Sequence, residues 1–353
     1  MRVVVTGATG NVGTSTVRAL AADPGIDSVL GLSRRPAELK IDKTEWAEAD
    51  VARHDLAAHF RGADAVVHLA WLFQPTHRPR VTWDNNVIGS ARVFRAVAEA
   101  GVPALVYASS VGAYSPVPSL ADKEHPRDES WPTHGWPEAA YGREKAYVER
   151  LLDSFQADHP DVRVVRLRPG FVFKREAASE QRRLFAGPLL PGRLVRPGMV
   201  PVVPDIPGLA FQALHTEDMA QAYRLAVTRD VRGPFNIAAE PVIDAAVLAE
   251  VLRARRVPVP AVGARAAVAA AWRLNLVPAS PHLVDMVLRL PIMDVTRARE
   301  ELGWNPEHTG VDALRELLEG LREGAGMDTP PLARETGGPM RLREMLTGVG
   351  RRP

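Results

Sequence analysis

Residues 1–20 read MRVVVTGATGNVGTSTVRAL. The β-branched run Arg2–Thr6 predicts a buried strand, and the glycines that follow interrupt this strand at once. From Asn11 onward the apolar residues recur at helical spacing, so the glycines lie where a strand leads into a helix N-terminus. Unpaired N–H groups and the helix macrodipole favour an anion such as a pyrophosphate at that point.

Each of the three glycines in this turn has an expected role. Gly7 allows the tight turn, Gly10 lets the backbone approach a phosphate, and Gly13 allows the helix to pack on the strand. Their spacing is Gly-x-x-Gly-x-x-Gly, which differs from the more familiar Gly-x-Gly-x-x-Gly. We predict a dinucleotide site that also includes Asn11 and Val12. The alternative is an ordinary turn between a strand and a helix.

The composition is that of a globular protein with enough apolar residues for a large core. The chain has 353 residues, 46% of them hydrophobic, and a formal charge of +2 from 44 basic and 42 acidic residues. Because these charges are spread along the chain, the pI near 9.0 does not predict nucleic-acid binding. The lack of cysteine excludes disulfides and thiolate catalysis, and we predict no metal site. We recognise no signal peptide and no membrane span, and we expect a cytoplasmic protein.

Strand and helix patterns alternate through the first half of the chain. After the first strand, further strands are expected at 28–32, 46–49, 64–70, 103–108 and 162–167, with helices at 79–100 and 138–155. Repeated βα units of this length predict an α/β fold with a Rossmann-type, doubly wound parallel sheet.

The second half of the chain has a different composition. Residues 175–207 are rich in proline, which is typical of a functional loop or lid, and we place the substrate side there. Residues 211–214 and 234–238 are expected to return to the sheet around a helix at 218–227, with Asp218 as its N-cap. Further helices are expected at 247–256, 265–274 and 296–302.

These patterns predict a division of the chain into three parts. They are a dinucleotide-binding domain (1–170, with a returning segment 208–240), a smaller, mostly helical C-terminal substrate domain (171–207 and 241–323) and a mobile tail (324–353).

The end of the second strand bears on the choice of cofactor. An acidic residue about 20 positions after the glycines holds the ribose 2′-hydroxyl of NAD, whereas an arginine accommodates the 2′-phosphate of NADP. Here Ser33, Arg34 and Arg35 stand in that place without an acid. We therefore predict NADP over NAD, with Ser33 and Arg34 in contact with it. The alternative is a solvated basic loop.

A second polar group falls at the ends of two middle strands. Tyr141 and Lys145 begin a helix at i,i+4 spacing, so both side chains lie on one face. Because an adjacent ammonium and a cationic nicotinamide both favour phenolate, Lys145 and the cofactor are expected to lower the pKa of Tyr141, which makes the phenol a general acid and base. Ser110 follows another strand and is expected to hydrogen-bond the substrate oxygen. A lone Tyr-x-x-x-Lys favours an ordinary surface helix, but its combination with the glycine turn and Ser110 favours catalysis.

Together these residues resemble the extended short-chain dehydrogenase/reductase family, which contains nucleotide-sugar epimerases and dehydratases. The resemblance rests on Thr6–Gly13, Asp50-Val51, His68–Ala70, Asp84–Ser90, Ser109-Ser110, Tyr141-x-x-x-Lys145, Arg168–Gly170 and Leu302–Pro306. The segment 84–90 looks most like UDP-glucose 4-epimerase-like proteins. The resemblance implies catalysis by Ser110, Tyr141 and Lys145. It also implies contacts to the cofactor from Asp50, Val51, Leu69, Ala70, Asn86, Ser109, Tyr141, Lys145, Pro169 and Val172.

Two departures limit the analogy. Phe171 stands where many nucleotide-sugar enzymes have an asparagine that holds the sugar diphosphate. Val111 and Gly112 replace the Asp-Glu pair of 4,6-dehydratases, so we expect no dehydration.

The resemblance implies an NAD(P)-dependent oxidoreductase or epimerase that moves a hydride between the nicotinamide and a carbinol or carbonyl carbon. The substrate is a small molecule, either a nucleotide sugar or, for an NADPH-dependent carbonyl reductase, a non-sugar compound. A protein that senses NADP without turnover is a third alternative, which the intact catalytic residues disfavour. The expected partners include no nucleic acid and no membrane, and we predict a homodimer.

Overall fold

The computed structural model of the chain describes residues 1–35, 37–74, 76–187, 195 and 197–334. Within these residues a seven-stranded parallel sheet has the order β11-β6-β5-β4-β1-β2-β3. The strands are β1 Arg2–Thr6, β2 Ser28–Ser33, β3 Thr44–Glu48, β4 Ala65–His68, β5 Ala104–Ala108, β6 Arg163–Pro169 and β11 Gly233–Ile237. The order reverses between β1 and β4, as in doubly wound sheets, and the predicted Rossmann architecture is confirmed.

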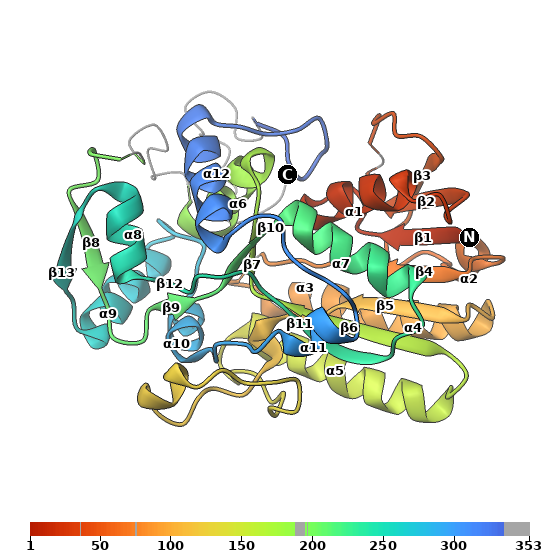
Figure 1. Ribbon diagram of the computed structural model, residues 1–353, viewed down its shortest axis with the longest axis horizontal. Helices are drawn as coiled ribbons and strands as arrows, with labels where there is room; N and C mark the ends of the chain where they lie inside the picture. Colours follow the sequence, from red (N-terminus) through yellow and green to blue (C-terminus); the bar gives the residue numbers. More distant parts are fainter. Residues whose placement is uncertain (36, 75, 188–194, 196, 335–353) are drawn as a thin grey trace.

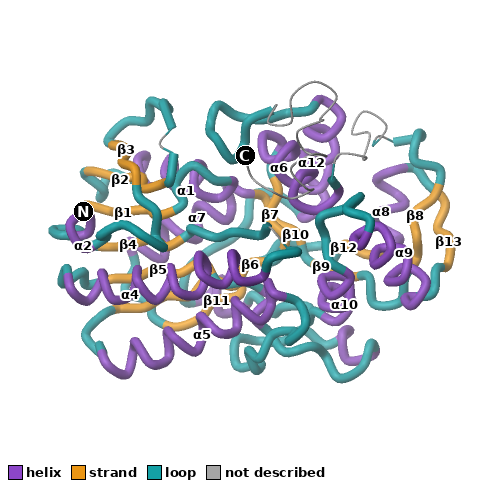
Figure 2. The backbone as a smooth tube through the Cα atoms, turned by 180° about the vertical axis from the view of Figure 1, so that it is seen from behind, coloured by secondary structure: helices purple, strands orange, loops and turns teal. Residues whose placement is uncertain are grey.

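Helices cover both faces of this sheet (Figures 1 and 2). They are α1 Asn11–Ala22 and α7 Thr216–Thr228 on one face, and α4 Gly89–Glu99 and α5 Ala140–Asp158 on the other, with the short α2 Ala57–Phe60 and α3 Pro79–Trp83. Val3 and Val5 of β1 pack under α1 and α7, whereas Val4 packs in the core under α4 and α5. Because both faces are covered, the central strands β1, β4 and β5 are mostly apolar.

The helix predicted at 79–100 is confirmed with one modification. α3 continues through a π-helical turn at Asp84–Ile88 into α4. The three elements form one helical run, and its middle turn contains about one residue more than an α-helical turn. This turn holds Asn85 and Asn86 beside the carboxyl end of β4.

The remaining elements lie mostly beyond the carboxyl ends of the sheet strands (Figure 1). They are β7 Phe171–Phe173, α6 Ala178–Gln181, β8 Val202–Asp205, β9 Ala210–Phe211, β10 Ala213–His215, β12 Ile243–Asp244, α8 Ala245–Leu252, β13 Arg255–Pro258, α9 Ala261–Arg273, α10 Pro281–Arg289, α11 Thr296–Glu300 and α12 Gly310–Glu323. Their strands form small pairs, β10 with β7, β12 with β9 and β13 with β8.

Two predictions about strands and helices in this region are wrong. Residues 211–214 do not return to the large sheet, because β9 and β10 pair with β12 and β7 instead. The helix predicted at 247–256 ends at Leu252, where Arg253 takes a left-handed φ of 52°, and β13 follows. A short apolar run does not show which sheet it joins, so the pattern alone was ambiguous.

The N-cap assigned to α7 is also wrong. His215 caps this helix, since its Nδ1 accepts a hydrogen bond from the Glu217 N–H at 3.3 Å. Asp218 lies one turn further in and is buried, and its carboxylate accepts hydrogen bonds from the N–H groups of Glu307 and His308. Asp218 therefore binds a distant loop to α7 rather than starting the helix.

The first part of the segment predicted as a mobile tail makes contacts with the rest of the protein. Residues 325–334, which we call the covering segment, pack against the glycine turn: the Thr329 hydroxyl donates to the carbonyl oxygen of Thr9 at 2.9 Å, and Leu332 is fully buried. Arg183 donates to the carbonyl oxygens of Pro331 and Ala333. The rest of the predicted tail, 335–353, lies outside the described residues.

Among the described residues no helix combines the length and the hydropathy that a membrane span requires.

Candidate active site

The predicted site residues meet at one cavity of about 760 Å³ at the carboxyl ends of the sheet strands. Its lining includes Gly7, Gly10, Asn11, Val12, Gly13, Ser33, Arg34, Asp50, Val51, Leu69, Ala70, Ser109, Ser110, Tyr141, Lys145, Pro169 and Val172. Open α/β sheets bind their ligands at this edge, where the strand order reverses. All the predicted site residues except Asn86 are therefore brought together.

The glycine turn has the shape that a pyrophosphate needs. Gly7 has a φ of 73°, and a Cβ there would lie 2.7 Å from the Ala70 nitrogen. A Cβ at Gly13 would lie 2.3 Å from the Gly7 carbonyl oxygen. Gly10 is the N-cap of α1 and offers no side chain to the first-turn N–H groups, and that turn carries no acidic residue. These groups fit the diphosphate of a dinucleotide.

The far end of the cavity lies past β2 and β3. The Ser33 hydroxyl donates to the Arg35 carbonyl oxygen at 2.8 Å and shapes the loop that carries Arg34. Arg34 is exposed and lines the cavity, as do Asp50 and the buried Val51. Asp50 accepts a hydrogen bond from the Ala52 N–H at 2.9 Å, which fixes the turn after β3.

Asn86 is fully buried and lies behind the cavity wall. Its Oδ1 accepts from the Leu72 N–H at 2.7 Å, and its Nδ2 donates to the Leu72 carbonyl oxygen and to Glu144 at 2.8 and 2.7 Å. Its neighbour Asn85 lines the cavity. Asn86 thus holds the loop after β4, which carries Trp71 and Phe73 into the site.

Ser110 follows β5, and Tyr141 and Lys145 lie in the first turns of α5. The Ser110 hydroxyl accepts a hydrogen bond from the Gly112 N–H at 3.0 Å, so its own proton is available to another acceptor. A Cβ at Gly112 would lie 2.7 Å from the Tyr141 ring. Gly112 therefore lets the phenol ring lie directly against the loop of Ser110, a role that the sequence did not reveal.

The predicted effect of Lys145 on the pKa of Tyr141 is wrong. Burial raises the pKa of Tyr141 to about 12, although the Ser110 hydroxyl acts in the opposite direction. Burial also lowers the pKa of Lys145 to about 7. The Lys145 ammonium donates to the Ala108 carbonyl oxygen at 2.6 Å and lies 3.5 Å from the Trp71 ring centroid, against 6.0 Å for the Tyr141 ring. The phenol is consequently protonated at neutral pH.

Aromatic rings surround the phenol. Phe73 stacks on the Tyr141 ring with a centroid distance of 4.9 Å and an interplanar angle of 13°, and Trp71 meets its edge at 6.0 Å. Phe185 in turn meets Phe73 edge-on at 5.6 Å. Sequence reasoning missed these rings, and the available signal was the run Trp71–Phe73 directly after a predicted strand.

A buried ion cluster supports the site from behind. Glu149 is fully buried and accepts hydrogen bonds from Arg166 and Arg168 at 2.9 Å each and from the Ser109 hydroxyl at 2.5 Å. Burial alone would raise the pKa of Glu149, but Arg168 and Arg166 outweigh it and hold the pKa at about 2. Ser109, predicted to touch the cofactor, lines the cavity, but its hydroxyl donates its hydrogen bond to Glu149.

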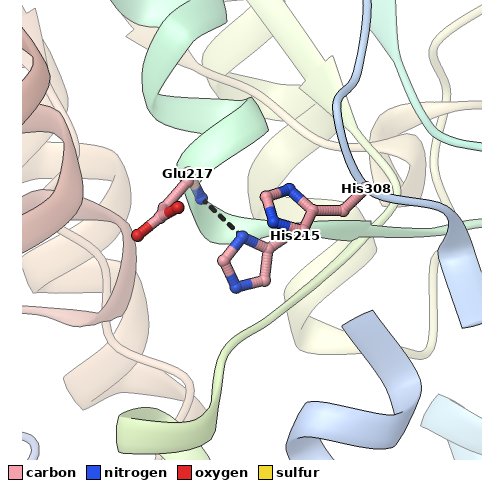
Figure 3. A group of neighbouring side chains, drawn as sticks. All are labelled: His215, Glu217 and His308. Atoms are coloured by element: carbon pink, nitrogen blue, oxygen red, sulfur yellow. Dashed lines mark hydrogen bonds between the residues drawn. The ribbon is translucent and has the colours of Figure 1, made fainter. Parts of the chain in front are cut away.

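His215, Glu217 and His308 gather at the start of α7, with ligand atoms within 4.8 Å of one another. Both nitrogens of His215 are already paired, Nδ1 with the Glu217 N–H and Nε2 with Glu316 at 3.1 Å. Figure 3 shows the Glu217 carboxylate directed away from the two rings. We assign the group to the helix cap.

Comparison with known proteins points to one family. The family model described as "NAD dependent epimerase/dehydratase family" matches residues 3–238, which contain the glycine turn, Ser110, Tyr141 and Lys145.

Individual relatives and structures agree with this match. A protein of Mycobacterium tuberculosis without an assigned function is 26% identical over 346 residues, covering 90% of this chain and 83% of that protein. An L-arabinose 1-dehydrogenase (NAD(P)(+)) of Haloferax volcanii is 31% identical over 194 residues, covering 51% of this chain and 70% of that enzyme. The structure of MoeE5 in complex with UDP-glucose and NAD shares the fold with a TM-score of 0.65 at 22% identity, covering 92% of this chain and 99% of that one.

Proposed function

The chain belongs to the NAD dependent epimerase/dehydratase family, and from this premise we propose that it interconverts a carbonyl and a carbinol in exchange with NADP(H). Membership makes it an NAD(P)-dependent oxidoreductase or epimerase. The observation that carries the finer proposal is the neutral phenol of Tyr141 beside Ser110, in the same cavity as Arg34.

The side chains define the proton chemistry. Nicotinamide supplies or accepts the hydride when the dinucleotide is bound. The Tyr141 phenol donates its proton to the carbonyl oxygen during reduction and takes it back during oxidation. The Ser110 hydroxyl, held by Gly112, donates a hydrogen bond to the same oxygen. The Lys145 ammonium favours the phenolate that forms once the proton has left.

The dinucleotide would be held along the whole cavity floor. The glycine turn would take the diphosphate, and Asp50 and Val51 would lie at the adenine. Arg34 would pair with a 2′-phosphate. The functional test measures hydride exchange between NADPH and a carbonyl substrate, with absorbance at 340 nm as the readout. If the protein binds NADPH but exchanges no hydride, this result would support a protein that senses NADP without turnover.

Epimerisation of a nucleotide sugar is the second candidate. The likeness of fold to MoeE5 favours it, because the MoeE5 structure contains UDP-glucose and NAD. An epimerase retains its NAD through turnover, whereas a reductase exchanges its cofactor. Mass spectrometry of the nucleotide released by denaturing the purified protein distinguishes an epimerase from a reductase: stoichiometric NAD indicates an epimerase.

That the protein forms a homodimer stays a prediction.

Arg34→Ala should weaken NADP binding roughly ten- to a hundredfold and leave NAD binding nearly unchanged. A guanidinium forms charge-assisted hydrogen bonds to a 2′-phosphate, each worth about 1.5–3 kcal/mol, and gains little from a neutral hydroxyl. Because Arg34 is exposed, added salt should reduce the wild-type preference. Calorimetric titration of both cofactors against both proteins measures the effect.

The matched control is Arg35→Ala, which removes the same charge one residue further along the loop. We expect it to change NADP affinity much less. Equal affinities of the wild type for NAD and NADP would show that Arg34 does not read the phosphate, and would favour the epimerase.

A further inference from the structure

The part of the cavity beyond Tyr141 has an apolar wall formed by one helix. Leu283, Val284, Met286 and Val287 of α10 all line the cavity, and Leu290 continues this wall past the helix end. Leu283, Met286, Val287 and Leu290 follow the helical i, i+3, i+4, i+7 spacing, and Val284 lies three residues before Val287. One side of α10 is therefore turned toward the site.

Aromatic rings extend this apolar lining. Phe171 and Phe211 pack against each other with centroids 4.9 Å apart, and both line the cavity. Phe73 and Phe185 extend the same surface to the Tyr141 ring. Phe171 occupies the position at which the resemblance calls for a diphosphate-holding asparagine, so the ring takes the place of a polar contact.

Charged groups are few on this side. Of the described lining residues that follow Gly170, Glu180 and Arg182 are charged. Both are buried and both have partners within the protein; the Arg182 guanidinium donates to the Gly187 carbonyl oxygen at 2.9 Å. A sugar diphosphate carries two negative charges, and burial of a charge without a partner is strongly unfavourable.

Ser110 and Tyr141 supply a polar anchor at this end of the cavity, and among the described residues Gln181 also lines it. The Ser110 hydroxyl and the Tyr141 phenol can hold a single oxygen atom, and apolar groups surround them. Binding in such a place depends on the apolar area removed from water and on one well-placed hydrogen bond.

Building on the proposed function, we propose that the substrate is a ketone or secondary alcohol with a bulky apolar body, one or two carbon rings in size, and not a nucleotide sugar. The oxygen would lie at Ser110 and Tyr141. The carbon body would lie against α10 and the rings of Phe171 and Phe211.

The test uses purified full-length protein with NADPH and three ketones of increasing apolar area, acetone, cyclohexanone and 2-decalone. Interconversion of UDP-glucose and UDP-galactose is measured in parallel, with NAD and with NADP. We expect kcat/KM to rise about fourfold for each methylene group that becomes buried, and more than about a hundredfold over the series. No interconversion of the UDP-sugars is expected.

A charge placed in the apolar wall should remove this selectivity. Val284→Asp is expected to lower kcat/KM for 2-decalone more than about tenfold, and by a larger factor than it lowers kcat/KM for acetone. Val284→Leu keeps the wall apolar and should retain activity. The matched control is Val262→Asp on α9, because Val262 is 79% exposed. NADPH affinity and thermal unfolding show that each variant is folded, and both should match the wild type.

The outcomes separate this inference from the proposed function. Two results would contradict the proposal of an apolar substrate and leave hydride transfer unaffected. One is a kcat/KM that does not rise across the three ketones, and the other is UDP-sugar turnover with a kcat/KM at or above that of 2-decalone. Binding of NADPH without hydride transfer to any probe overturns both. If kcat/KM rises across the ketones for the wild type and rises much less for Val284→Asp, both the apolar substrate and the proposed function are supported.

Discussion

Tyr141→Phe is expected to reduce turnover by about 10²–10⁴-fold, the range typical of a lost general acid–base group, with little change in cofactor affinity. The substitution removes the phenol proton and keeps the ring that stacks on Phe73 and lies against Gly112. Packing is therefore preserved while the proton donor is lost. Steady-state rates and the Kd for NADPH, measured on the same preparations, distinguish the two effects.

The matched control is Tyr147→Phe. Tyr147 lies on the same helix, is 46% exposed and packs against Trp83 away from the cavity. It should turn over at the wild-type rate. If Tyr141→Phe retained that rate as well, the proton would have to come from another group, and the role of Tyr141 would have to be abandoned.

Glu149→Gln is expected to lower the free energy of unfolding by about 3–5 kcal/mol, the usual cost of breaking a buried ion pair. The amide keeps the volume but leaves Arg166 and Arg168 as buried charges without a carboxylate. Equilibrium unfolding in urea measures the loss. Glu319→Gln, which breaks a surface pair with Arg322, is the control and should cost at most about 1 kcal/mol.

The same carboxylate gives this stability a pH dependence. Because the pKa of Glu149 is depressed to about 2, its contribution is complete above the ordinary glutamate pKa of about 4.3 and is lost as pH falls from there through about 2. Glu149→Gln should lack this part of the acid transition. A variant as stable as the wild type at neutral pH would contradict the role of the cluster.

The features that the sequence predicts well are those that depend on neighbours along the chain. The strand and glycines of residues 2–13, and the one-turn spacing of Tyr141 and Lys145, are local patterns, and the structure places them as predicted. Alternation of strands and helices likewise suffices for a doubly wound sheet, because parallel strands require crossover connections.

The misses depend on distant parts of the chain. The pKa of Tyr141 follows from burial under the loop of Trp71 and Phe73, which no spacing on α5 reveals. His215, and not Asp218, is the N-cap of α7. The Asp218 carboxylate accepts hydrogen bonds from residues about 90 positions away. The partners of β9 and β10 are decided in the same way, by tertiary packing.

The covering segment makes the site a late product of protein synthesis. Thr329 and Thr9, joined by a hydrogen bond, are 320 positions apart. At about 5–20 residues per second, the ribosome adds Thr329 roughly 15–65 s after Thr9, and N-terminal regions fold first. The glycine turn and the strands around it can therefore assemble on a nascent chain well before residues 325–334 exist. During this interval the carbonyl oxygen of Thr9 lacks the hydrogen bond that Thr329 donates in the complete fold.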